Sequence, residues 1–207
     1  MKLLNIICSP RGEKSRTNEI AKVFLKTVEE KYPDIVIENL DLTSANLPIV
    51  LGDAVDAKYS FMAGVSPDEK SLRAWNEISR YSTEFVQADI YLISTPMWNF
   101  SIPYRLKQYI DIIMQAGTMF KFTESGVQGL AENKKMFVIS SRGSDYGQGT
   151  PMNQFDFLEP YLRSIFGFGG ITDISFLHAQ PLDYSPDLAA SVMEKARKDA
   201  ELLALTI

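Results

Sequence analysis

Short apolar runs alternate with segments of helical periodicity along the whole chain. The runs predict five strands, at residues 3–7, 35–42, 90–93, 136–139 and 171–177. Near-continuous apolar runs of this length are typical of strands buried on both faces of a parallel sheet. Apolar residues spaced three or four apart predict helices in residues 15–33, 66–87, 103–117, 155–167 and 186–205.

Five strands separated by helices indicate an α/β fold with helices on both faces of a parallel sheet. Residues 43–65 are irregular, and we expect one helix within them. Residues 118–130 are expected to form a small hairpin or an extended loop. Ser66 is the expected cap of the helix that follows it, with Glu69 completing a capping box. No linker or repeat divides the chain, so we expect one domain over residues 1–207.

Composition narrows the class of protein. The 207 residues carry a net charge of -5, which argues against nucleic-acid binding because that normally needs a basic face. Cys8 is the only cysteine, so no intrachain disulfide can form. No run approaches the ~18 apolar residues of a membrane span. We therefore expect a cytoplasmic protein with no membrane partner.

The loop after the first predicted strand has the features of an anion site. Residues 9–18 lead into a helix N-terminus, whose free amides and dipole favour an anion. The loop matches neither GxxxxGK[ST] nor GxGxxG, so a terminal monophosphate fits better than a pyrophosphate. Alternatively, Ser15 and Thr17 serve only to cap the helix. This segment alone does not decide between the two.

The loop after the third predicted strand is unusually apolar. Met97, Trp98 and Phe100 lie between a buried strand and a helix, where they suggest a cover for a flat ligand. The alternative is a loop that folds back on its own core. Asn99 would hydrogen-bond the edge of a heterocycle or stabilise the turn.

The loop after the fourth predicted strand is polar and rich in glycine. Residues 140–149 include Gly143, which allows a ligand to approach the backbone closely, although a mobile surface loop would look the same. All three loops follow parallel strands, and ligands bind at that edge of such sheets. The three are therefore expected to form one site.

Together the loops resemble the FMN-dependent NADH-azoreductase family, within the flavodoxin-like NAD(P)H-quinone reductase group. The resemblance covers nearly the whole chain and is carried by residues 96–100, 116–124, 141–144 and 166–171. It implies a flavodoxin-like sheet of strand order 2-1-3-4-5. Trp98 stands where the family commonly has tyrosine, and Ser144 stands where it has glycine, which leaves acceptor preference open.

The resemblance also implies a cofactor, a reaction and an assembly. FMN would be bound while NADH donates electrons, and azo compounds and quinones would accept them in alternating half-reactions. The family is homodimeric, with a substrate pocket at the subunit interface that Phe120 and Phe122 would line. No catalytic side chain is expected, because the flavin carries the chemistry. The expected cofactor-binding residues are Ser9, Ser15, Arg16 and Thr17 at the phosphate, Met97, Trp98, Asn99 and Phe100 beside the ring, and Ser141, Arg142, Gly143 and Ser144 on its other side.

The sequence leaves two other functions open, and it offers two further residues with potential chemistry, His178 and Cys8. A non-enzymatic electron carrier of the flavodoxin type is the main alternative, and NADH oxidation would separate the two. A binding protein without FMN is a further alternative. His178 is a conceivable general acid, but with no partner evident it is better interpreted as a packed or surface histidine. Cys8 is expected to be a buried small hydrophobe.

Overall fold

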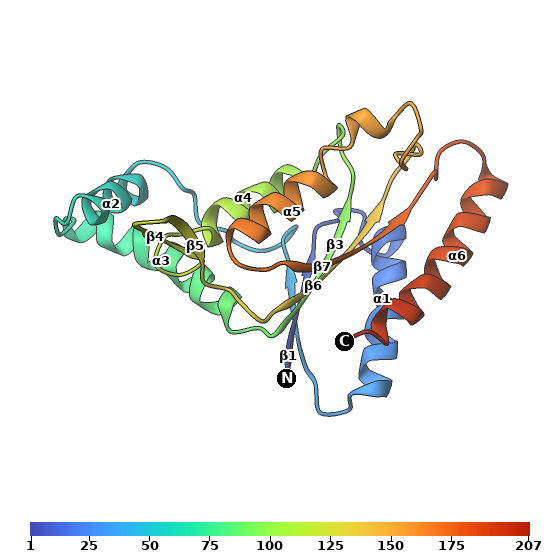
Figure 1. Ribbon diagram of the computed structural model, residues 1–207, viewed down its shortest axis with the longest axis horizontal. Helices are drawn as coiled ribbons and strands as arrows, with labels where there is room; N and C mark the ends of the chain where they lie inside the picture. The colour runs from blue at the N-terminus through green and yellow to red at the C-terminus, as the bar shows by residue number, and fades with distance from the viewer.

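A five-stranded parallel sheet runs through the middle of the molecule (Figure 1). The computed structural model describes residues 1–207. The strand order is β2-β1-β3-β6-β7, and every neighbouring pair is parallel. This confirms the predicted order, since the two extra strands form a separate hairpin. The sheet strands are β1 (Lys2–Ile7), β2 (Val36–Asp41), β3 (Ile90–Pro96), β6 (Lys135–Ser141) and β7 (Asp173–Ala179).

Helices cover both faces of the sheet, as predicted. One face carries α1 (Arg16–Lys31) and α6 (Pro186–Ala204), and the other carries α3 (Glu69–Val86), α4 (Tyr104–Ile113) and α5 (Glu159–Phe168) (Figure 1). Each face has its own buried core. Phe24 of α1 packs on Phe137 on one side, and Phe85 of α3 stacks on Tyr91 on the other.

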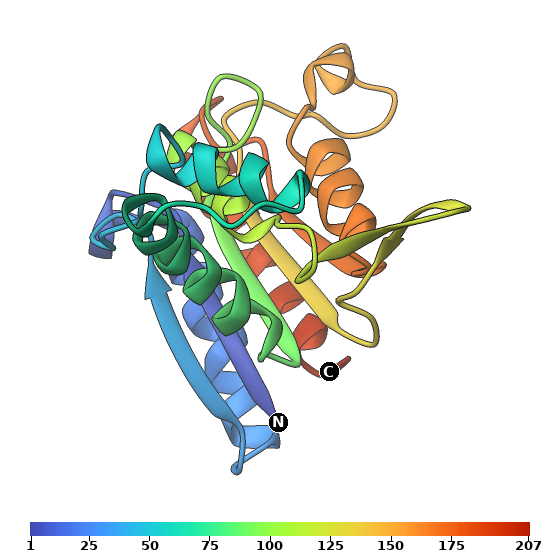
Figure 2. The same ribbon diagram turned by 90° about the vertical axis from the view of Figure 1, so that its left-hand side faces the viewer.

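The irregular segment after β2 contains the one helix expected, α2 (Asp53–Met62), which packs against α3 (Figure 2). Arg105 of α4 holds the start of this segment by donating to the carbonyls of Leu42 and Ala45. The predicted cap of α3 was wrong. Asp68, not Ser66, accepts hydrogen bonds from the first-turn amides, because its carboxylate lies immediately before the first helical residue.

Two helix boundaries differ from the prediction by four residues each. The helix expected to reach residue 117 ends at Ile113, where the Gln115 amide donates to the carbonyls of the last turn. The helix expected from residue 155 begins at Glu159, because Asp156 accepts from the first amides of α5. Phe155 instead lies in the short 3-10 helix η2 (Asn153–Phe155).

The predicted hairpin is formed by β4 (Phe120–Thr123) and β5 (Gly126–Gly129) and projects from the α5 side of the sheet (Figure 2). Its base packs tightly on the turn between α5 and β7. A Cβ on Gly129 would overlap the backbone of Gly170, and the Leu130 amide donates to the Gly169 carbonyl at 3.1 Å. The close approach therefore depends on glycine at position 129.

Cys8 lies just beyond the end of β1 and is 1% exposed. Burial raises the pKa of its thiol well above the ordinary value. The expectation of a buried small hydrophobe is confirmed. None of the helices combines the length and the apolar character needed to cross a lipid bilayer.

Candidate functional site

A cavity of about 220 Å³ lies at the carboxyl edge of the sheet, where the loops after β1, β3 and β6 converge. The structure thus brings the three singled-out loops together, with a fourth after β7. The cavity is lined by Ser9, Pro10, Arg11, Ser15, Arg16, Pro96, Met97, Trp98, Ser141, Arg142, Gly143, Leu182 and Asp183. The expected site residues Thr17, Asn99, Phe100 and Ser144 do not line it.

The N-terminus of α1 supplies free amides to this cavity. Ser15 is the helix cap, and its hydroxyl accepts from the Asn18 amide at 3.1 Å while its carbonyl accepts from the Glu19 amide at 3.0 Å. The amides of Arg16 and Thr17 precede the first intrahelical bond and have no partner within the helix. Ser15 therefore caps the helix, and the free amides beside it are of the kind that favours an anion.

Side chains from α1 join it to the neighbouring loops. The hydroxyls of Thr17 and Ser141 lie 2.6 Å apart. The guanidinium of Arg16 donates to the Leu182 carbonyl at 3.1 Å and to the Asp183 carboxylate at 3.2 Å. Arg16 therefore faces the loop after β7, which sequence analysis missed because only the loops after three strands were searched. The edge rule for parallel sheets applies to that loop equally.

The apolar loop after β3 forms a tight two-residue turn. The backbones of Trp98 and Ser101 exchange two hydrogen bonds of 2.9 Å, and Asn99 and Phe100 between them have φ of 46° and 70°. Asparagine tolerates this left-handed conformation, whereas phenylalanine is strained in it. The Phe100 ring is held by stacking on Phe155, with centroids 5.2 Å apart.

The turn does not fold back into the core. Trp98 and Phe100 are each 41% exposed, and Trp98 lines both the first cavity and a second one of about 510 Å³. An exposed aromatic beside a polar cavity suits contact with a flat ligand. The second cavity is lined by Trp98, Asn99, Ser101, Ile102, Pro103, Tyr104, Lys107 and Tyr161.

The loop after β6 is held by its backbone on both sides. Ser141 accepts from the Met97 amide at 2.9 Å, and Gly143 accepts from the Asp183 amide at 3.0 Å. A Cβ on Gly143 would meet the Asp183 carboxylate, the end of an exposed side chain, which would have to turn aside. The guanidinium of Arg142 bonds the Asp156 carboxylate at 2.8 Å. Asp156 does not line the first cavity, so this side chain is directed away from it.

His178 is a packed histidine, as expected, but it has two partners that were not evident from the sequence. Its Nδ1 lies 2.7 Å from the Ser140 hydroxyl, and its Nε2 lies 2.6 Å from the Glu159 carboxylate. The hydrogen bond to His178 is the main reason that the pKa of Glu159 falls to about 2. Ser140 and His178 are paired across β6 and β7. The strand register was the signal that would have revealed this contact.

The two expected pocket residues lie apart from the cavity in this chain. Phe120 packs on Phe122 and Phe168, with ring centroids 5.7 Å and 4.8 Å away. Phe122 is 67% exposed and borders a different cavity of about 450 Å³, which it shares with Phe61 and Met62 near the end of α2. These aromatics form an exposed apolar surface beside the hairpin.

Comparison with known proteins places this architecture in a family. A family model described as a flavodoxin-like fold matches residues 1–203. An "FMN-dependent NADH:quinone oxidoreductase" of Nitratidesulfovibrio vulgaris is 41% identical over 206 residues, covering 98% of each chain. A protein of the same name from Desulfotalea psychrophila is also 41% identical, covering 98% of this chain and 96% of its own.

Solved structures agree with these sequence relatives. An azoreductase from Bacillus anthracis superposes with a TM-score of 0.92 at 27% identity over the whole of both chains. An FMN-dependent NADH-azoreductase from Bacillus anthracis, solved with FMN, gives a TM-score of 0.86 at 27% identity, covering 98% of this chain and 99% of its own. The chain therefore belongs to the flavodoxin-like family, in the group whose curated members are named FMN-dependent NADH:quinone oxidoreductases.

Proposed function

We propose that this protein is an FMN-dependent oxidoreductase that takes electrons from NADH and passes them to quinones and azo compounds. The supporting observation is the convergence of three features at one cavity: the free amides of α1, the exposed Trp98 and the glycine-bearing loop after β6. The names of the relatives supply the donor and the acceptors.

The residues present suit FMN. The amides of Arg16 and Thr17, with the Ser9 and Ser15 hydroxyls nearby, would bind the phosphate at the positive end of the helix dipole. Met97 to Phe100 would lie beside the isoalloxazine ring. Ser141 to Ser144 would approach it from the other side, where Ser141, Arg142 and Gly143 line the cavity.

The chain's role is to bind, orient and polarise. When bound, FMN supplies the hydride-accepting and electron-donating chemistry. Backbone amides near Asn99 and Gly143 would donate to the ring edge where negative charge grows on reduction, and such fixed donors are effective because they need little reorganisation. The exposed Trp98 side is where nicotinamide and acceptor would bind in turn, so we propose a ping-pong order.

We propose that the active form is a homodimer. Phe61, Met62 and Phe122 are exposed apolar residues gathered around one cavity, and apolar patches of this kind commonly mark protein interfaces. In such a dimer Phe120 and Phe122 would line the partner's substrate pocket, which accounts for their distance from the cavity of their own chain. The single cysteine is buried and unpaired, which fits the reducing cytoplasm that we propose as the location.

An anaerobic titration tests the proposal. Protein loaded with FMN is titrated with NADH while the absorbance of oxidised flavin is followed, and a benzoquinone or azo dye is then added. Bleaching by NADH followed by recovery on adding the acceptor is the expected result. A flavin that stays oxidised with NADH would instead indicate an electron carrier or an enzyme with another donor.

A further inference from the structure

A buried polar network lies behind the loop after β6, on the opposite side from the proposed flavin cavity. Arg142 is its centre, with only 1% of its side chain exposed. Its guanidinium donates to the Asp156 carboxylate at 2.8 Å and to the Ser140 hydroxyl at 3.1 Å. His178 and Glu159 complete the network. All of its members except the fully buried Ser140 border a separate cavity of about 610 Å³, and among them only Arg142 also borders the first cavity.

The hydrogen-bond partners assign the protons in this network. Arg142 Nε donates to Ser140 Oγ, so the Ser140 hydroxyl is free to donate to Nδ1 of His178 at 2.7 Å. Nε2 of His178 then donates to Glu159 at 2.6 Å. With the imidazole neutral and its proton on Nε2, Arg142 Nε, the Ser140 hydroxyl and His178 Nε2 each have an acceptor. The contact of 3.2 Å between Arg142 Nη2 and the same Nε2 shares no proton in this arrangement.

The network connects the loop to two other elements. Asp156, which pairs with Arg142, also accepts from the amides of Leu158 and Glu159 and so begins α5. The Arg142 backbone amide donates to the carbonyl of Ala179, the last residue of β7, at 3.0 Å. The loop backbone is therefore fastened to α5 and β7 on the side facing away from the cavity.

We propose that Arg142 is a positioning residue, whose buried guanidinium, held by Asp156 and the Ser140–His178 pair, fixes the backbone of residues 141–143 against the flavin without touching it. This inference rests on the proposed function. It replaces the sequence-based expectation that the Arg142 side chain is itself a flavin ligand. A buried arginine fork can hold two partners at defined angles, which a lysine cannot.

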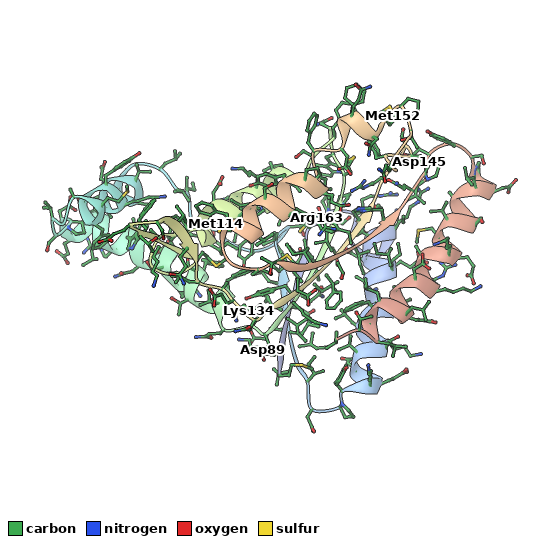
Figure 3. All side chains as sticks on the ribbon, viewed as in Figure 1. Asp89, Met114, Lys134, Asp145, Met152 and Arg163 are labelled. Atoms are coloured by element: carbon green, nitrogen blue, oxygen red, sulfur yellow. The ribbon has the colours of Figure 1, made fainter.

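The test compares substitutions that keep or remove the hydrogen bonds joining Arg142, Ser140 and His178. His178→Asn places an amide oxygen near the position of Nδ1 and keeps an acceptor for Ser140, whereas His178→Gln places its amide near Nε2 and does not. Ser140→Ala removes the hydroxyl that joins Arg142 to His178. Arg142→Lys removes the guanidinium that donates to this hydroxyl. Lys134→Met is the matched control, because it removes a partly buried cation at the opposite end of β6 (Figure 3).

Three measurements are made on each variant: the FMN dissociation constant, the midpoint potential of the bound flavin, and urea unfolding of the FMN-free protein. We expect Ser140→Ala, His178→Gln and Arg142→Lys to raise the dissociation constant about tenfold, as loss of one buried hydrogen bond does, and to shift the potential. His178→Asn should stay within about twofold of wild type. Lys134→Met should lower stability while leaving binding and potential unchanged.

The proposal is overturned if Arg142→Lys impairs binding but Ser140→Ala and His178→Gln do not, because the guanidinium would then contact the flavin directly. Unchanged binding in all three variants would overturn it as well. Wild-type protein that takes up no FMN would overturn the proposed function together with this inference.

Discussion

The hydroxyls of Thr17 and Ser141 lie 2.6 Å apart and join the first helix to the loop after β6. The contact links the proposed phosphate end of the site to its ring end, although 124 residues separate the two in sequence. This contact therefore restrains both α1 and the loop after β6, and a change at Thr17 should alter the contacts at both ends of a bound flavin.

Thr17→Val tests this link. Valine keeps the shape but leaves the partly buried Ser141 hydroxyl without its partner, at a cost of about 1–3 kcal/mol. We expect the FMN dissociation constant to rise about tenfold. Thr27→Val is the control, because the Thr27 hydroxyl bonds only a carbonyl of the same helix. Equal affinities in the two variants would show that the link does not matter.

A branched substitution at Asn99, in the turn after β3, should affect both the unfolding free energy and FMN binding, whereas the same change outside the site should affect only the unfolding free energy. Glycine adopts the φ of 46° at position 99 freely, so Asn99→Gly should leave the unfolding free energy within about 0.5 kcal/mol. Asn99→Val should cost about 1–2 kcal/mol and also weaken FMN binding, since a branched residue resists this conformation. Asn133 has φ of 59° outside the site, so Asn133→Val should cost similar stability without affecting affinity. Urea unfolding and FMN titration measure both quantities.

Fold-level features followed from the apolar pattern, but the positions of several side chains did not. The strands and the hairpin were predictable because period and turn signals are local, whereas the strand order came from the family resemblance. The direction of Arg142 was not, since it depends on Asp156, a residue that belongs to the start of α5 rather than to the loop. Likewise, the place of Phe122 depends on how the hairpin packs against the turn after α5.

Gly129→Ala should destabilise the fold without reaching the cavity. The new methyl group would meet the Gly170 backbone, which cannot move aside as a flexible side chain would. A loss of about 2–3 kcal/mol is expected, lowering Tm by roughly 4–12 °C. Gly167→Ala, in open space on α5, should instead raise Tm slightly because alanine favours a helix. A thermal melt of the FMN-free protein that ranked them in the reverse order would contradict this packing.

Protonation of Glu159 should contribute to the loss of unfolding free energy at acid pH, on the acid limb of the stability curve. Its folded pKa of about 2 lies below the ordinary value of 4.5, so the carboxylate stabilises the fold above about pH 4.5, and this contribution is lost as the pH falls toward 2. Allowing for solvent screening, the effect is about 2 kcal/mol. Glu159→Gln should flatten this limb in urea unfolding, whereas Glu84→Gln, in an exposed ion pair, should not. A limb that is unchanged in Glu159→Gln would exclude this contribution.

The buried thiol at the end of β1 has a practical consequence. Because Cys8 is almost inaccessible and its raised pKa keeps it protonated at neutral pH, it should resist alkylating reagents in the folded protein. The natural chain is therefore a ready background for site-specific labelling. A single cysteine introduced on the exposed hairpin, for example at Val127, would carry a fluorophore that reports whether two chains come together there.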